Sequence, residues 1–277
     1  MDESDIETLL DVPVFAELPA SHSAAHPLRD RLRHLLPAGH AADLALEAAA
    51  ASDFAIPAAA SEWVEALHRL RASLLLAHSG SSPHVIAITP AAPEPRPKRV
   101  AAHAEYSEEQ QPSLALSLAA VLAQHGSPVL YVDADLRSAP SADVFPVAAG
   151  LSDALAGDDL PEYDHPSLTP PLLSVLSTGP RPPCPAELIA SERMTALLAR
   201  WRREFTFVVI DSPPAVYADA LVLAQQADAV LLAAQAGKTR RNQIAPAFDA
   251  LARQVPAHAA LGVILADAPG GGHNARA

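Results

Sequence analysis

The sequence predicts an α/β fold, in which a doubly wound, mainly parallel sheet carries helices on both faces. Short apolar runs rich in Val, Ile and Leu alternate along the chain with longer segments of helical periodicity, an order typical of parallel sheets. Within these runs nearly every residue is apolar, as expected of strands buried on both faces. Apolar residues make up 50% of the chain, which is enough to bury a sizeable core.

The first predicted helix follows Ser61, a residue that can cap its N-terminus. Trp63, Leu67 and Leu74 share one face of this helix, at the spacing of a buried stripe. Strands are expected at residues 84–89, 128–132, 172–176, 205–210, 229–234 and 261–265, and further helices at 114–125, 186–203 (as one helix or two), 218–226 and 240–254.

Composition divides the chain into three segments. Residues 1–57 are rich in Asp, His, Pro and Ala, and we expect an N-terminal extension that is partly disordered, with a short extended stretch at residues 12–18. Residues 58–268 hold the predicted α/β domain. The Gly-rich residues 269–277 are expected to form a disordered tail.

Charge and cysteine content argue against several functions. The formal net charge of −13 argues against binding to nucleic acid or to an anionic membrane surface, because both need clustered Lys and Arg. A single Cys allows no disulfide framework. The chain shows neither a signal-peptide pattern nor a run apolar enough to span a membrane, so we expect a cytoplasmic protein.

Acidic residues stand at the ends of two predicted strands. Asp133 and Asp135 follow one strand, and Asp211 ends another. Ligands of such sheets bind beyond the carboxyl ends of the strands, where carboxylates can hold Mg²⁺ beside a nucleotide. On pattern alone, an Asp at a strand end can equally be a turn former or a helix cap.

Seven blocks in order resemble motifs of the bacterial tyrosine kinases (BY-kinases), which share a P-loop NTPase-like architecture with the MinD and ParA ATPases. Val129-Leu-Tyr-Val-Asp-Ala-Asp-Leu-Arg137 resembles their second Walker motif (Walker A′), and Val208-Val-Ile-Asp-Ser-Pro-Pro214 resembles their Walker B motif. Further matches are residues 150–157, 179–189, 219–221, 227–230 and 237–239. The resemblance as a whole covers roughly residues 86 to 265.

The resemblance implies roles for these residues. Asp133 and Asp135 would help to coordinate Mg²⁺ and to activate the incoming tyrosine, and Asp211 would hold Mg²⁺ through water. Arg137 would lie near the phosphates. ATP and Mg²⁺ are thus the implied cofactors if the protein is active.

The family's phosphate-binding loop, Gly-x-Gly-Lys-Ser/Thr, has no counterpart here. Residues 91–125 contain no Gly, although the loop needs Gly so that backbone N–H groups face the phosphates. Depending on the alignment, the loop falls on residues 107–113, which are acidic, or on 93–98, where Pro residues lack the N–H. Lys98 or Arg99 could still approach a phosphate. We therefore expect weak ATP binding or none.

Three other features depart from the family. In its Glu-x-x-Arg-x-x-Arg segment, which supports ring assembly, His68 replaces the middle Arg. Ala266 stands where the last strand would end in Asn. The C-terminal tyrosine cluster that these kinases phosphorylate on themselves is missing, because the tail has no Tyr.

The preferred hypothesis is a catalytically inactive relative of the kinases, a pseudokinase that serves exopolysaccharide or capsule synthesis and export. Its partner would be a membrane polysaccharide co-polymerase or an active BY-kinase, either of which could hold it at the inner face of the plasma membrane. Residues 12–19 resemble the segment that joins the membrane part to the kinase domain. Two alternatives stay open: a residual tyrosine kinase or ATPase with an atypical loop, and a decayed gene product without function.

Overall fold

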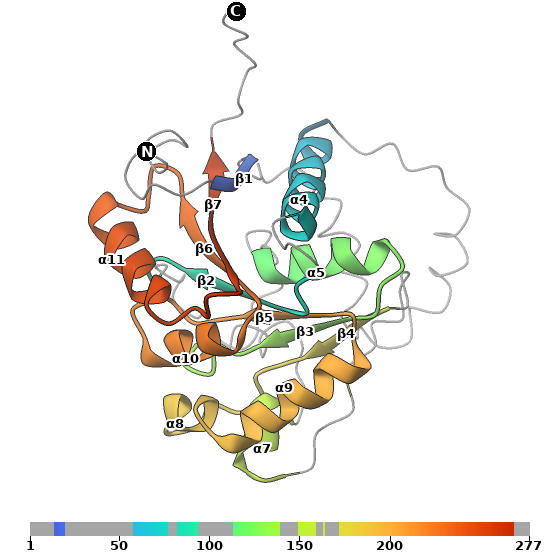
Figure 1. Ribbon diagram of the computed structural model, residues 1–277, viewed down its shortest axis with the longest axis vertical. Helices are drawn as coiled ribbons and strands as arrows, with labels where there is room; N and C mark the ends of the chain where they lie inside the picture. Colours follow the sequence, from blue (N-terminus) through green and yellow to red (C-terminus); the bar gives the residue numbers. More distant parts are fainter. Residues whose placement is uncertain are drawn as a thin grey trace, which may run out of the picture.

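The computed structural model describes seven parts of the chain, drawn in colour in Figure 1: residues 14–19, 58–76, 82–93, 113–138, 149–158, 163 and 172–268. These parts form one parallel sheet with helices on both faces. The predicted fold class is therefore confirmed.

The sheet contains seven strands in the order β1-β7-β6-β2-β5-β3-β4, and every neighbouring pair is parallel. Their bounds are β1 Val14–Pro19, β2 Val85–Pro90, β3 Val129–Asp133, β4 Leu173–Leu176, β5 Phe207–Asp211, β6 Ala229–Gln235 and β7 Ala260–Ala268. The strands expected from the apolar runs all form, within a few residues of the expected ends. Strand β2 lies between β5 and β6, so the carboxyl ends of β2, β5 and β3 are neighbours.

The helices divide between the two faces of the sheet (Figure 1). On one face lie α4 (Ala58–Leu76) and α5 (Leu114–Gln124), and on the other α7 (Leu151–Ala156), α8 (Pro185–Ile189), α9 (Glu192–Glu204), α10 (Ala218–Gln226) and α11 (Arg241–Ala252). The segment 186–203, expected as one helix or two, forms two. Ser191 starts the second, because its Oγ accepts a hydrogen bond from the N–H of Met194 at 3.3 Å.

The predicted start of the first helix was wrong. Helix α4 begins at Ala58, so Ser61 lies inside its first turn and does not cap it. Three Ala residues precede Ser61, and Ala has the highest helix propensity. They extend the helix past the cap signal. The apolar stripe of this helix is confirmed, since Leu67 and Leu74 are buried against the sheet.

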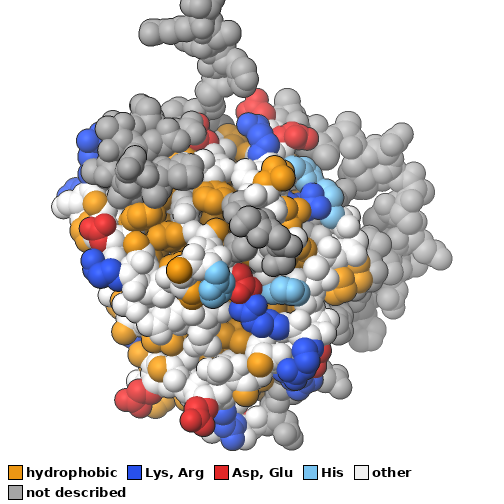
Figure 2. Space-filling model, viewed as in Figure 1, with side chains coloured by type: hydrophobic (Ala, Val, Ile, Leu, Met, Phe, Trp, Pro, Cys, Tyr) orange, Lys and Arg blue, Asp and Glu red, His pale blue; other side chains and the backbone are white. Residues whose placement is uncertain are grey.

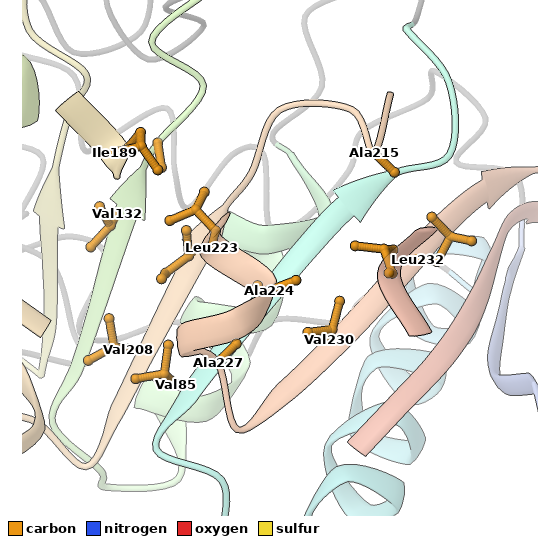
Figure 3. Packing of buried hydrophobic residues seen from close by; sticks show 14 of the residues in the cluster. Val85, Val132, Ile189, Val208, Ala215, Leu223, Ala224, Ala227, Val230 and Leu232 are labelled. Carbon is orange, nitrogen blue, oxygen red and sulfur yellow. The ribbon is translucent and has the colours of Figure 1, made fainter. Parts of the chain in front are cut away.

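Two hydrophobic layers stabilise the sheet. One layer joins α4 and α5 to the side chains of alternate strand residues, such as Tyr131 and Val209. The opposite layer holds the intervening strand residues and the second group of helices. In Figure 3, Leu223 and Ala224 of α10 pack over the strands. The other labelled residues of this layer are Val85, Val132, Ile189, Val208, Ala215, Ala227, Val230 and Leu232. Burying one such aliphatic side chain contributes about 1.5–3 kcal/mol.

The edge strand β1 lies in the segment expected to be an N-terminal extension. Residues 14–18 of the extended stretch predicted at residues 12–18 form a strand, which pairs in parallel with β7; residues 12 and 13 lie outside the described residues. Gly262 of β7 makes this approach possible, because a Cβ at that position would overlap the ring of Phe15. Residues 14–19 are therefore part of the sheet.

No helix within the described ranges has the length and apolar character needed to cross a bilayer. On the face shown in Figure 2, Lys, Arg, Asp and Glu side chains are scattered among hydrophobic and His side chains. This face therefore presents charges of both signs.

An ion pair anchors the amino end of the sheet. Asp228, just before β6, accepts hydrogen bonds from Nη1 and Nη2 of Arg202 at 2.6 and 2.9 Å. The same carboxylate accepts from the backbone N–H groups of His84 at 3.0 Å and Val85 at 2.8 Å. Burial alone would raise the pKa of Asp228, but these hydrogen bonds together lower it. The pair thus joins α9, β2 and β6.

We predict that Asp228→Ala lowers the free energy of unfolding by about 2–4 kcal/mol, because Arg202 and the Val85 N–H lose a largely buried acceptor. The control is Glu204→Ala, which breaks an exposed pair with Arg200 and is expected to cost under about 1 kcal/mol. Urea denaturation at pH 7 measures both.

The pH dependence of this difference checks its cause. The carboxylate of Asp228 has a pKa below its ordinary value of 3.8 in the folded protein. Its stabilising contribution is therefore fully present at pH values above 3.8. This contribution is lost as the pH falls from there through the lower pKa of the folded state. The gap between the native chain and Asp228→Ala should shrink below about pH 4. A gap that stays constant down to pH 3 would contradict this account.

Candidate functional site

Three neighbouring strands end at one edge of the sheet, where two of the predicted site residues, Asp133 and Asp211, lie. Thr89 lies near the end of β2, Asp211 ends β5 and Asp133 ends β3. Asp133 and Asp211 are direct partners in the pairing of β3 with β5. Both share the α5 face of the sheet, because they follow Tyr131 and Val209 by two residues. Thr89 falls on the opposite face by the same alternation.

The Walker A′-like turn is held together by its own carboxylates. Oδ1 of Asp133 accepts a hydrogen bond from the N–H of Asp135 at 3.1 Å. Oδ1 of Asp135 accepts one from the N–H of Ser138 at the same distance. Both side chains are buried, with 0% and 6% of their surface exposed. The two aspartates therefore serve the local structure of this turn as it stands, whatever they do with a ligand.

Tyr131 belongs to the site, although its position in the sequence predicts no role for it. Its hydroxyl donates a hydrogen bond to Oδ2 of Asp211 at 3.0 Å. Burial, followed by the negative charges of Asp211 and Asp133, raises the pKa of Tyr131 well above its ordinary value of 10.0. The phenol therefore keeps its proton and acts as a donor. The only signal in the sequence was a polar ring inside an apolar strand, which does not name its partner.

The N-terminus of α5 lies at the same edge. Ser113 caps this helix, with its Oγ accepting a hydrogen bond from the N–H of Leu116 at 3.1 Å. The same Oγ lies 3.5 Å from the hydroxyl of Tyr131. In a phosphate-binding fold, the free N–H groups of this first turn would face the anion. Here one of them is bonded to the protein's own cap.

Arg137 forms a clasp with α10. Its Nε donates to both carboxylate oxygens of Asp219, at 2.8 and 3.1 Å, and Asp219 is fully buried. The guanidinium also lies over the ring of Tyr217, 4.6 Å from its centroid. The hydrogen bond to Asp219 raises the pKa of Arg137, and this effect exceeds the lowering that burial causes. This contact joins the Walker A′-like turn to α10, which follows the Walker B-like segment. The role of Arg137 near the phosphates stays a prediction.

Two of the blocks that resemble family motifs, residues 150–157 and 179–189, meet beside this edge. The N–H groups of Leu151 and Ser152 bond to the carbonyl oxygens of Ser177 and Thr178. A Cβ at Gly150 would overlap the backbone of Gly179. Close backbone contact therefore requires Gly at positions 150 and 179, which accounts for these two Gly residues of the motifs.

Other expected site residues have no described position. Residues 94–98, with Lys98, and residues 107–112 lie outside the described residues, so only Pro93 and Ser113 of the two candidate phosphate loops are described. Thr89 is described; its Oγ1 is buried and has no hydrogen-bond partner.

His68, which is expected to replace an Arg of the ring-assembly segment, contacts the end of α5. Its ring packs edge-on against His125 with centroids 5.1 Å apart. Burial, then the neighbouring His125, lowers the pKa of His68. In this structure the side chain takes part in packing between α4 and the end of α5.

The residues at the edge only partly suit Mg²⁺. Carboxylate oxygens are the ligands that Mg²⁺ prefers, so Asp133, Asp135 and Asp211 are chemically suitable. Across the described parts of the chain, however, no group of three or more His, Cys, Asp or Glu residues is arranged to hold a metal ion. One oxygen of Asp211 accepts from Tyr131, and one of Asp133 accepts from Asp135. The arrangement does not fit a preformed metal site.

The chain is similar to bacterial tyrosine kinases in sequence and in structure. It is 37% identical over 147 residues to tyrosine-protein kinase YwqD of Bacillus subtilis, covering 52% of this chain and 62% of YwqD. It is 31% identical over 188 residues to tyrosine-protein kinase Etk of Escherichia coli K12, covering 67% of this chain and 24% of Etk. The kinase domain of Escherichia coli Etk matches with a TM-score of 0.69 and 27% identity, over 96% of this chain and 94% of that domain.

The chain belongs to the bacterial tyrosine kinase family. The resemblance drawn from its motifs is thereby confirmed. No protein-family model matches the chain. It spans less than two thirds of YwqD and about a quarter of Etk, so the match to Etk concerns only part of that relative.

We predict that Arg137→Met destabilises the protein by about 2–4 kcal/mol, because the buried carboxylate of Asp219 loses its guanidinium partner. Adding Asp219→Asn to this variant should restore part of the loss, since no buried charge then remains unpaired. Urea denaturation measures the three proteins.

The matched control is Arg181→Met, at an exposed position, with an expected change within about 0.5 kcal/mol. If Arg137→Met is as stable as this control, the clasp does not contribute to folding.

Proposed function

We propose that this member of the kinase family is a pseudokinase, which acts as a partner or regulator in exopolysaccharide or capsule synthesis and export. The observation that carries the proposal is that residues 91–125, where the phosphate-binding loop is expected, contain no Gly. The single Lys of this stretch, Lys98, stands between Pro97 and Arg99 rather than after a Gly. Without Gly, successive N–H groups cannot easily turn toward phosphates.

The hydrogen bonds at the sheet edge support this proposal. A nucleotide triphosphate brings negative charge toward Asp133, Asp135 and Asp211, and without a cationic loop this approach is repulsive. Each lost charge-assisted hydrogen bond costs about 1.5–3 kcal/mol, so losing several reduces affinity by several factors of ten. The Ser113 cap and the Tyr131 donor already use groups that a bound nucleotide and cation would need.

The alternative function is that of a residual tyrosine kinase or ATPase with an atypical loop. The presence of Asp133, Asp135 and Asp211 favours it, since these are the residues that the family's motifs place at the chemistry. In that case Lys98 or Arg99 would have to replace the missing Lys. Against it stand the structural roles of two of these aspartates in the Walker A′-like turn.

Nucleotide binding separates the two functions. Titration of the purified chain with a fluorescent ATP analogue and Mg²⁺ is expected to show no saturable binding in the micromolar range, whereas the kinase domain of Escherichia coli Etk serves as the positive control. Micromolar binding that disappears in Asp133→Asn would refute the pseudokinase.

Partner binding tests the positive half of the proposal. Two pull-downs are needed, one with the cytoplasmic segments of a membrane polysaccharide co-polymerase and one with an active bacterial tyrosine kinase. At least one of them is expected to retain the chain. Retention should be independent of added ATP and should survive Asp133→Asn. Failure with both partners would favour a decayed gene product.

A further inference from the structure

A continuous line of polar groups connects the first turn of α5 to the end of β5. It runs from the N–H of Leu116 to Oγ of Ser113, on to the hydroxyl of Tyr131 and then to Oδ2 of Asp211. The steps measure 3.1, 3.5 and 3.0 Å. The line thus crosses from α5 through β3 to β5.

The direction of these hydrogen bonds follows from the number of protons available. Tyr131 has a single hydroxyl proton and donates it to Asp211. Its oxygen can therefore only accept from Ser113, which in turn accepts from Leu116. Every donor in the line points toward the carboxylate of Asp211, and hydrogen bonds aligned in this way strengthen one another.

The ring of Tyr131 has a separate role from its hydroxyl. It packs within the hydrophobic layer under α4 and α5, and only 3% of the residue is exposed. A Phe at this position would fill the same volume without the donor. Asp211, in contrast, is only partly buried, so a cation from solvent could reach it.

We propose that Tyr131 is an internal lock, whose hydroxyl satisfies Asp211 and joins it to the Ser113 cap, so that the acidic edge is stable without a divalent cation. This inference rests on the proposed pseudokinase function and deepens it. It explains how a site that retains its aspartates can dispense with the ion that the family's chemistry requires.

The lock has a cost for metal binding. A cation that coordinates Asp211 must compete with a charge-assisted, partly buried hydrogen bond. Hydrogen bonds of this kind correspond to about ten- to hundredfold in affinity. Removing the hydroxyl should therefore weaken the apo protein and at the same time increase its response to Mg²⁺.

The test is thermal unfolding of the full chain and of Tyr131→Phe, in EDTA and in millimolar Mg²⁺, without nucleotide. The native chain is expected to melt at the same temperature in both buffers. Tyr131→Phe should melt several degrees lower in EDTA and recover part of this loss in Mg²⁺. Adding Asp211→Asn should abolish the recovery, which places the ion at Asp211.

Two further variants make the experiment decisive. Tyr163→Phe is the matched control, because it also loses a Tyr hydroxyl, one that accepts a hydrogen bond from Trp201 of α9. Its melting temperature should not respond to Mg²⁺. Ser113→Ala removes the donor to Tyr131 together with the cap of α5, so its melting temperature in EDTA falls for two reasons and only its response to Mg²⁺ is compared. That response should be smaller than the response of Tyr131→Phe. This variant keeps the proposal testable if Tyr131→Phe does not fold.

The lock is refuted if Tyr131→Phe and Ser113→Ala melt like the native chain in EDTA, or if neither gains a response to Mg²⁺. This outcome would leave the pseudokinase proposal standing. Conversely, micromolar ATP binding by the native chain would end the pseudokinase proposal, whereas the nucleotide-free melting data would still decide the role of Tyr131.

Discussion

The parallel pairing of β3 with β5 places Asp133 directly beside Asp211. Two carboxylates on neighbouring strands repel each other, more strongly within a protein than in water, and each needs hydrogen-bond donors to remain there. The surrounding structure supplies them: the backbone of the Walker A′-like turn donates to Asp133, and Tyr131 donates to Asp211. The local architecture of this edge depends on that requirement.

Under the proposed function, this constraint accounts for an acidic half of the site that is kept without the phosphate half. The acidic half is built into the sheet and its turns, so replacing Asp133 or Asp135 would remove hydrogen bonds from buried positions. Under the proposed function, the phosphate half corresponds to residues between 91 and 113, which are rich in Pro and acidic residues and contain no Gly, whereas the strands of the sheet are formed. Aspartates can therefore persist for structural reasons, which reduces their weight as a sign of catalysis.

Much of the fold could be predicted because its signals are local. The strand at residues 205–210 and its Asp211 terminus were read from a short apolar run, and the observed β5 ends at that residue. The cap at Ser61 failed because the Ala residues before it extend the helix. Edge strand β1 was expected only as an extended stretch, since its partner β7 lies some 250 residues away. Sequence distance of this kind hides a partner from any local pattern.

The amino-acid sequence by itself determined the family, the parallel sheet, the acidic strand ends and the absence of Gly from residues 91–125. Each of these is a matter of residue type and spacing along the chain. Only the tertiary structure decided what the side chains do: Tyr131 reaches Asp211 across 80 residues, and Arg137 reaches Asp219 across 82. Hydrogen bonds depend on direction and on distances of about 3 Å, and these exist only once the strands have paired.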